Sequence, residues 1–150
     1  MQVVSAYRLR DRYFIHPSKR TTEGAWVAQP QFVSLPLDSS TETLGHAILA
    51  SLAESDGTVD HPTAWRTFSN ARLTAAGVRS ERAFGTAARL VVVCRTDSIS
   101  LEPTHNGGIS GAGRGFTSLE GGRITVPTDS TPGIVGQTFL RVLEECTHAA

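Results

Sequence analysis

The pattern of apolar and polar positions predicts mostly β-strands with helices in a few places. The nearly continuous apolar run Leu90–Arg95 predicts a central strand, because a strand covered on both faces is apolar at almost every position. Shorter alternating segments on either side of turn residues predict hairpins. The expected strand pairs are Val3–Leu9 with Tyr13–His16, and Phe116–Leu119 with Arg123–Val126; Ala25–Ala28 and Gln31–Leu35 form a further hairpin or one bulged strand.

One strand-turn-helix unit occurs twice in the sequence. Residues 34–55 align without a gap with residues 125–146, and the matched positions include Pro36 with Pro127 and Gly45 with Gly136. Two copies are too few for a solenoid, which needs at least three repeats to bury a continuous core. We therefore expect a pseudo-symmetric pair of units within one domain spanning residues 1–150.

Both copies of the repeat carry a well-marked helix. In the first, Ser39 and Glu42 have the spacing of a capping box. In the second, Thr131 is a good N-cap and Pro132 suits the first helical position. Each helix has an apolar stripe and one internal glycine, which costs about 1 kcal/mol relative to alanine and indicates close packing.

The segment between the first helix and the central strand predicts a short helix, a break at Gly77 and a second short helix capped by Ser80. The aromatic residues Trp65, Phe68 and Phe84 of this segment, together with Trp26 before the first helix, are expected to pack in the core. Hairpins together with two long helices predict an α+β fold: a single, largely antiparallel sheet with both long helices packed on it.

Charge is balanced overall and uneven locally. The 150 residues hold 14 basic and 14 acidic side chains. Residues 1–20 and 61–100 are rich in arginine, whereas residues 21–60 hold six acids and no lysine or arginine. Neutrality argues against nucleic-acid binding by bulk charge, and no apolar run approaches the ~20 residues of a membrane span. With an early-charged N-terminus and two cysteines, the sequence indicates a cytoplasmic protein.

No segment carries a recognisable catalytic or metal motif. The glycine-rich run Gly107–Gly115 lacks both the P-loop lysine and the dinucleotide-binding spacing. The five histidines and two cysteines show no zinc-ligand spacing. Cys94 and Cys146 fall on apolar stripes and are expected to be buried. We therefore predict no catalytic residue, no metal and no cofactor, so the chain is not expected to be an enzyme.

The order of segments resembles the immunity proteins of contact-dependent growth inhibition systems, the CdiI kind. The resemblance covers about Tyr7 to Cys146 and is most specific at Arg20–Ala28 (RTTEGAWVA), His61–Trp65 (HPTAW) and Val78–Phe84 (VRSERAF). It implies a cytoplasmic protein of bacterial competition that binds the C-terminal domain of a CdiA-type toxin and neutralises it. It also implies that this toxin is a nuclease for which transfer RNA is a plausible substrate.

The acidic block suggests how such a toxin is recognised. A nuclease groove is basic because it holds phosphates, and an acidic inhibitor surface can imitate them and speed association. We hypothesise that the toxin-binding residues are Asp38, Glu42, Glu54, Asp56 and Asp60. The family supplies no residue-level motif for this choice, and neither the toxin's identity nor the oligomeric state follows from the sequence.

Two other classes of function stay open. The chain could be a nucleic-acid-binding module that uses arginines on a sheet face, namely Arg8, Arg10, Arg12, Lys19 and Arg20. It could also be a small enzyme or ligand-binding protein built around Gly107–Gly115. On the immunity-protein reading, no direct contact with nucleic acid or membrane is expected.

Overall fold

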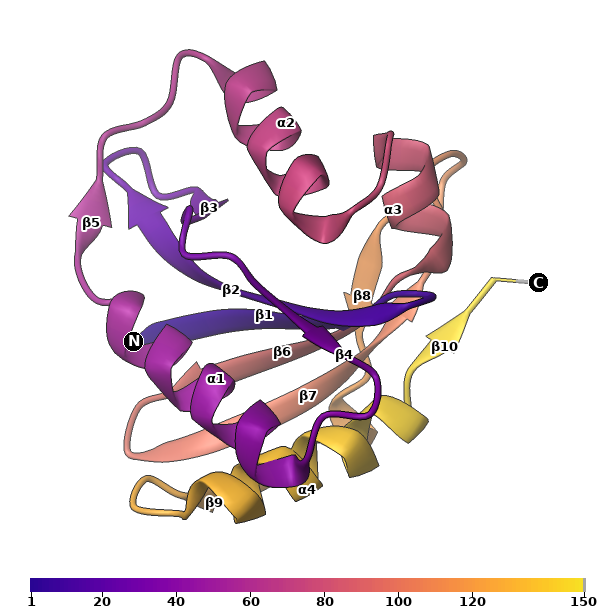
Figure 1. Cartoon of the computed structure of the whole chain (residues 1–150). Helices are drawn as coiled ribbons and strands as arrows, with labels where there is room; N and C mark the ends of the chain where they lie inside the picture. Colours follow the sequence, from indigo (N-terminus) through magenta and orange to yellow (C-terminus); the bar gives the residue numbers. More distant parts are fainter. Residues whose placement is uncertain (150) are drawn as a thin grey trace.

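Ten strands form one curled sheet with helices on both faces (Figure 1). The computed structural model describes residues 1–149, with every side chain in that range except that of Phe68. The strands are β1 (Gln2–Arg8), β2 (Arg12–Thr21), β3 (Trp26–Ala28), β4 (Val33–Pro36), β5 (Thr58–Val59), β6 (Arg89–Arg95), β7 (Ser98–Asn106), β8 (Phe116–Ser118), β9 (Ile124–Pro127) and β10 (Thr147–His148). The α-helices are α1 (Thr41–Glu54), α2 (Trp65–Ala76), α3 (Glu81–Ala87) and α4 (Pro132–Glu144).

The strand order is β10-β7-β6-β1-β2-β3, with β4 and β5 also paired to β2 and β8 and β9 also paired to β7. Within residues 1–149, the parallel pairings are those of the short β5 with β2 and the short β10 with β7. The predicted α+β fold, a largely antiparallel sheet with two long helices from a repeated strand-turn-helix unit, is confirmed.

The internal repeat is larger than the sequence alignment indicates. In one half, β1 pairs with β2, β2 with β4, and α1 follows; in the other, β6 pairs with β7, β7 with β9, and α4 follows. The register agrees as well. Pro36 ends β4 opposite Arg12, and Pro127 ends β9 opposite Ser98. The two halves meet where β1 pairs with β6, so the sheet is pseudo-symmetric.

The main core lies between the sheet and the pair α1 and α4. Alternate strand residues such as Val4, Ile15, Val93 and Leu101 point into it and are fully buried. The two helices cross at the paired glycines of the repeat. A Cβ on Gly45 would overlap the backbone carbonyl of Pro132, and a Cβ on Gly136 would overlap that of Thr41. Each glycine therefore permits contact between the backbones of the two helices.

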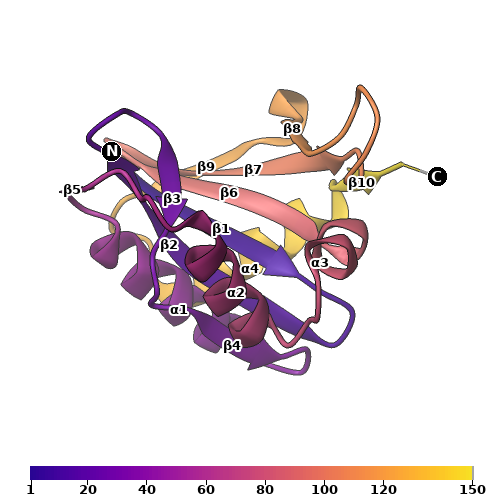
Figure 2. The ribbon, with the colours of Figure 1, turned by 90° about the horizontal axis from the view of Figure 1, so that it is seen from above.

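The opposite face of the sheet carries a second, aromatic core beneath α2 and α3. Its members include Tyr7, Phe14, Leu73 and Phe84. Figure 2 shows that α2 and α3 lie over one part of this face, while β7 and β9 have no helix above them. The pseudo-symmetry thus includes the sheet and the helices α1 and α4, but not the helices on the second face. The unequal covering of the second face leaves room for a cavity.

Several sequence predictions need correction. Segments β3 and β4 do not pair with each other as a hairpin, since both pair with β2; likewise β8 and β9 both pair with β7. Strand β6 is central but not buried on both faces, because its side at Val92 and Cys94 is only half-covered. The N-cap of α1 is Ser40, whose hydroxyl accepts from the Thr43 N–H, rather than Ser39. No helix in residues 1–149 has the length and hydropathy to cross a membrane.

Candidate functional site

A cavity of about 340 Å³ opens between the sheet and α2. Its floor comes from β1 and β2, one wall from β3, and its roof from α2. The residues that line it are Ser5, Tyr7, His16, Ser18, Trp26, Val27, Ala28, Trp65, Ser69 and Arg72. This combination of aromatic walls and a few polar groups is typical of a ligand-binding pocket.

Two tryptophans that the sequence assigns to the core lie instead at this cavity. Trp26 is 40% exposed and Trp65 is 48% exposed. Trp65 packs edge-on against His61 with ring centroids 5.4 Å apart, and the Arg20 guanidinium lies 5.9 Å from the Trp26 ring. Phe84 is buried as expected, whereas the prediction for Phe68 lies outside the described side chains. Exposed tryptophans beside a cavity are characteristic of binding anchors.

The polar groups on the cavity floor are held neutral. Burial lowers the pKa of His16 to about 4, and the ring Nδ1 lies 3.0 Å from the Pro17 carbonyl, to which it can donate. Burial also raises the pKa of Tyr7, against the opposing influence of Arg72. At neutral pH His16 is therefore an uncharged ring and Tyr7 an uncharged phenol. Groups in these states suit hydrogen bonding to a partner better than proton transfer.

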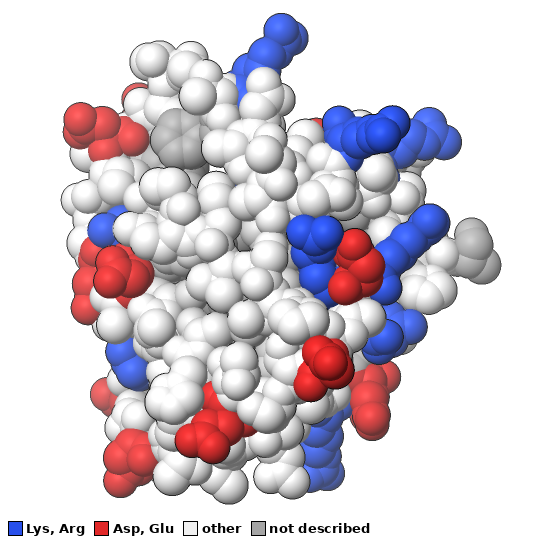
Figure 3. All heavy atoms as spheres, in the orientation of Figure 1, with Lys and Arg blue, Asp and Glu red and all other residues white. Residues whose placement is uncertain are grey.

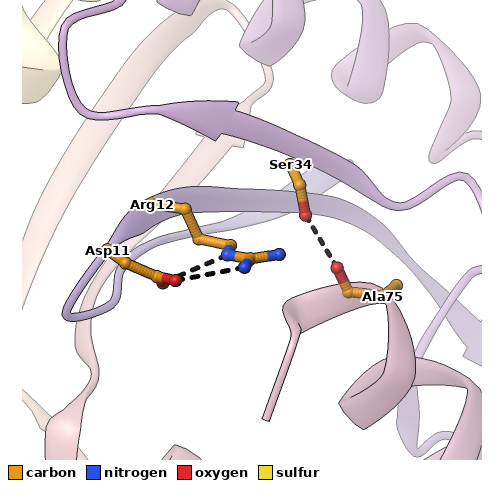
Figure 4. A network of polar contacts seen from close by, with 4 residues as sticks. All are labelled: Asp11, Arg12, Ser34 and Ala75. Atoms are coloured by element: carbon orange, nitrogen blue, oxygen red, sulfur yellow. Dashed lines mark hydrogen bonds and ion pairs between the residues drawn. The ribbon is translucent and has the colours of Figure 1, made fainter.

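Helix α2, the roof of the cavity, is fixed to the sheet at its C-terminal end (Figure 4). The Ser34 hydroxyl in β4 donates to the Ala75 carbonyl at 2.7 Å. The Arg12 guanidinium lies beside Gly77, where the chain leaves α2 with φ +73°, and donates to both oxygens of Asp11. Arg72 also donates to Glu81 and lies over the Phe84 ring. The Ser34 contact joins the C-terminal end of α2 to β4, and the Arg72 contacts join α2 to α3.

The five acidic residues predicted to bind the toxin are all exposed but do not form one cluster. Asp38 and Glu42 lie at the start of α1, whereas Glu54, Asp56 and Asp60 lie at or beyond its end. From Glu42 to Glu54 the helix rises about 18 Å. Glu42 lies 3.8 Å from His46, and Asp56 accepts a hydrogen bond from Gln2. The chain therefore presents two acidic groups at opposite ends of one helix.

Asp60, the last member of the group at the end of α1, precedes His61, which contacts Trp65 of the tryptophan cavity. Strand β5 follows Asp56 and pairs with the end of β2, which places Asp60 and His61 beside the β2–β3 turn. His61 bridges this region, since its ring contacts Trp65, its Nδ1 lies 3.1 Å from the Thr21 hydroxyl and its Nε2 lies 3.2 Å from a Glu23 oxygen. Sequence patterns do not single out Glu23 as a site residue, because its contact with His61 depends on the pairing of β5 with β2.

The glycine-rich segment Gly107–Gly115 folds back on itself. Gly107 and Gly115 are joined by a backbone hydrogen bond of 2.8 Å, which closes the segment on itself. The buried Asn106 amide donates to the carbonyls of Gly85 and Ala88, and Ile109 rests on Gly85. A hydrogen-bonded loop seated on α3 results. Within residues 1–149, no three His, Cys, Asp or Glu side chains are grouped as metal ligands.

Both cysteines are thiols of low reactivity. Burial raises the pKa of Cys94 and of Cys146, which disfavours the nucleophilic thiolate. Cys146 is buried as predicted and donates to the Leu90 carbonyl at 3.3 Å. Cys94 is half-exposed, contrary to prediction, because no helix covers its part of the sheet.

No protein-family profile and no curated protein matches this chain. Two solved structures share its fold over almost its full length. One is a protein of unknown function from Neisseria meningitidis, 13% identical, with a TM-score of 0.74 over 97% of this chain and 94% of that one. The other is a chain of the CdiA-CT/CdiI toxin and immunity complex from Yersinia pseudotuberculosis, 14% identical, with a TM-score of 0.75 over 97% of both chains. At these identities the likeness concerns the fold.

Proposed function

We propose that this chain is an immunity protein that binds and neutralises the C-terminal domain of a CdiA-type toxin in the cytoplasm of the cell that makes both. The observation that carries the proposal is the shared fold, end to end, with a chain of a toxin and immunity complex. The order of sequence segments supports the same family independently of that comparison.

The cavity supplies the kind of surface that this function needs. An inhibitor requires a rigid face with a few anchors that become buried on binding, and tryptophan is the most frequent anchor. Trp26 and Trp65 are exposed on two different elements around one cavity whose roof is fixed to the sheet. The neutral Tyr7 and His16 beneath them suit binding rather than turnover. We therefore infer that the chain acts by binding and is not an enzyme.

The five acidic residues remain our proposal for charge recognition of the toxin. Glu54, Asp56 and Asp60 would face the toxin together with the tryptophans, and Asp38 and Glu42 would extend the contact along α1. An interface of standard size covers ~800 Å² on each partner and is about 30 Å across, wide enough for both groups. A basic toxin groove, as in a nuclease that acts on transfer RNA, is the complementary surface.

Growth rescue tests this function. The toxin domain to use is the C-terminal part of a CdiA-type protein from the same genome, expressed from an inducible promoter in a sensitive host. We expect growth arrest with the toxin domain alone and normal growth when this chain is co-expressed. The matched control is the chain carrying both Trp26→Ala and Trp65→Ala, which we expect to fold and to protect less. Arrest that the wild-type chain does not relieve would contradict the proposal.

A further inference from the structure

Arginines gather at the end of the molecule formed by the β1–β2 turn and α3 (Figure 3). We define the arginine end as Arg8, Arg10, Arg79, Arg82 and Arg89. None of the five has a carboxylate within 4 Å among residues 1–149, whereas Arg12, Arg72 and Arg123 are each paired with an acid. The arginine end therefore carries uncompensated positive charge in a protein whose net charge is zero.

Two of these arginines are placed where mutual repulsion is strongest. Arg8 of β1 and Arg89 of β6 are direct partners across the antiparallel ladder. Like charges in directly opposed positions destabilise a sheet. With Arg10 they surround a hollow of about 200 Å³ whose remaining lining is Leu9 and Ala87. Three arginines in the lining of a small hollow that contains no acid suit the binding of an oxyanion.

A second hollow continues the positive surface toward α2. It measures about 410 Å³, shares Leu9, Arg10 and Ala87 with the first, and adds Arg79 and Thr86. Arg82 lies one helical turn before Thr86 on α3. The Thr86 hydroxyl donates a hydrogen bond to the Arg82 carbonyl. The one acid in its lining, Asp11, is paired with Arg12 in two contacts of 3.1 Å. Consecutive anionic groups can therefore follow one another from hollow to hollow.

We propose that the arginine end binds the phosphate backbone of a nucleic acid strand, without base selection. Guanidinium groups match phosphate oxygens in paired hydrogen bonds, and adjoining hollows fit a chain with regularly repeated anions. A protein interface usually combines arginine with buried tryptophan or tyrosine anchors. The exposed large hydrophobics of the described residues are Met1, Trp26, Trp65, Ile109 and Ile134, and none of them lines either hollow.

This inference differs from the basic site expected from sequence and is independent of toxin binding. Arg8 and Arg10 belong to both, but Arg12 is paired with Asp11. Lys19 and Arg20 lie at the far end of β2, about 26 Å of strand away from Arg12. Arg79, Arg82 and Arg89 take their place. The sequence does not show this grouping, because residues from the first hairpin and from α3 meet only after β1 pairs with β6.

Fluorescence anisotropy with a short labelled single-stranded RNA tests the proposal on the full chain without any toxin. We expect binding that weakens with salt, with a slope of about 0.7 in log K for each phosphate contacted. Arg8→Gln, Arg10→Gln and Arg89→Gln combined should lower the slope by about 2 and weaken binding at low salt by at least about tenfold. The control variant combines Arg66→Gln, Arg114→Gln and Arg141→Gln, which removes three positive charges outside the arginine end. It should retain most of the affinity for RNA.

Three results would overturn the proposal. The first is no RNA binding at low salt, and the second is equal loss in both triple variants, which would indicate net charge alone. The third is equally tight binding of polyglutamate or of inorganic phosphate, which would indicate an acidic protein or a single-oxyanion site. Thermal unfolding of each variant verifies that it is folded. Growth rescue from the toxin uses a different surface, so failure of one proposal leaves the other standing.

Discussion

Gly45 of α1 and Gly136 of α4 occupy equivalent places in the repeat, and each lies against the first turn of the other's helix. The carbonyl of Pro132 fills the space beside Gly45, and the carbonyl of Thr41 fills the space beside Gly136. The internal glycines of both helices are thus explained by helix-to-helix contact. The repeat is held together at this crossing, on the side of the sheet away from the cavity.

We predict that Gly45→Ala destabilises the protein despite the higher helix propensity of alanine. The added methyl group meets backbone atoms that cannot rotate away, and overpacking of this kind costs typically 1–3 kcal/mol, so we expect a loss near the upper end, about 3 kcal/mol. The free energy of unfolding in urea measures it. Gly133→Ala in the partner helix α4 is the control, since a Cβ added there would have no atom within 4 Å. If Gly45→Ala leaves the free energy of unfolding unchanged, the close backbone contact between α1 and α4 at Gly45 is wrong.

We predict that Trp26→Ala and Trp65→Ala each weaken toxin binding by about 2 kcal/mol or more, because truncating a buried tryptophan anchor removes most of its contact. Both side chains are partly exposed in the free protein, so its folding stability should change little. Titration calorimetry with the toxin domain gives the affinity. Ile134→Ala removes a comparably exposed apolar side chain from α4 and serves as the control. Equal effects of all three changes would show that the cavity is not the interface.

Neutralising the acidic residues should slow association with the toxin. The variant carries Asp38→Asn, Glu42→Gln, Glu54→Gln, Asp56→Asn and Asp60→Asn. We expect the association rate at low salt to fall by about tenfold or more and its salt dependence to flatten, because steering by opposite charge is lost. Stopped-flow fluorescence measures both quantities.

The control for that variant neutralises five exposed acids elsewhere: Asp97, Glu120, Asp129, Glu144 and Glu145. Two of these, Asp129 and Glu145, are the repeat-related counterparts of Asp38 and Glu54. Two further variants divide the loss of association rate between the two ends of α1. One neutralises Asp38 and Glu42, and the other neutralises Glu54, Asp56 and Asp60. If the five-residue variant binds the toxin at the wild-type rate and affinity, these residues are not the recognition surface.

His16 should make the protein less stable in acid. Its pKa falls from 6.5 in the unfolded chain to about 4 in the folded one, so the unfolded state binds the proton more readily between these values. The stability from a neutral His16 is complete above pH 6.5 and is lost as the pH falls toward 4, by up to about 3 kcal/mol. Urea unfolding at several pH values, compared with His16→Gln, isolates this contribution. Parallel pH profiles of the two proteins would rule it out.

The sequence predicts the repeated unit and the helices well because their signals are local. The N-cap at Thr131, the break at Gly77 and the stripes of α1 and α4 depend on neighbouring residues only, and the structure confirms each of them. Hairpins were harder to predict. Segments β3 and β4 look like two strands of a hairpin, yet both pair with β2, because the ten-residue β2 offers enough edge for both.

The candidate site was the least predictable part. Trp26 and Trp65 were assigned to the core because tryptophan is usually well buried. Their exposure results from the way α2 stands away from the sheet, fixed through Ser34 and Arg12. The burial of His16 and the proximity of Glu23 to His61 likewise depend on strand pairing across distant segments. No local pattern encodes these arrangements.

The most direct test of the central claim is co-purification from cells that express this chain with a tagged toxin domain. We predict that the untagged chain is retained with the toxin domain through washes at high salt, because apolar anchors at Trp26 and Trp65 are not screened as charges are. Size-exclusion chromatography of the eluate should show one complex. If the chain appears only in the unbound fraction while the toxin domain is folded and toxic, it is not the immunity protein of that toxin.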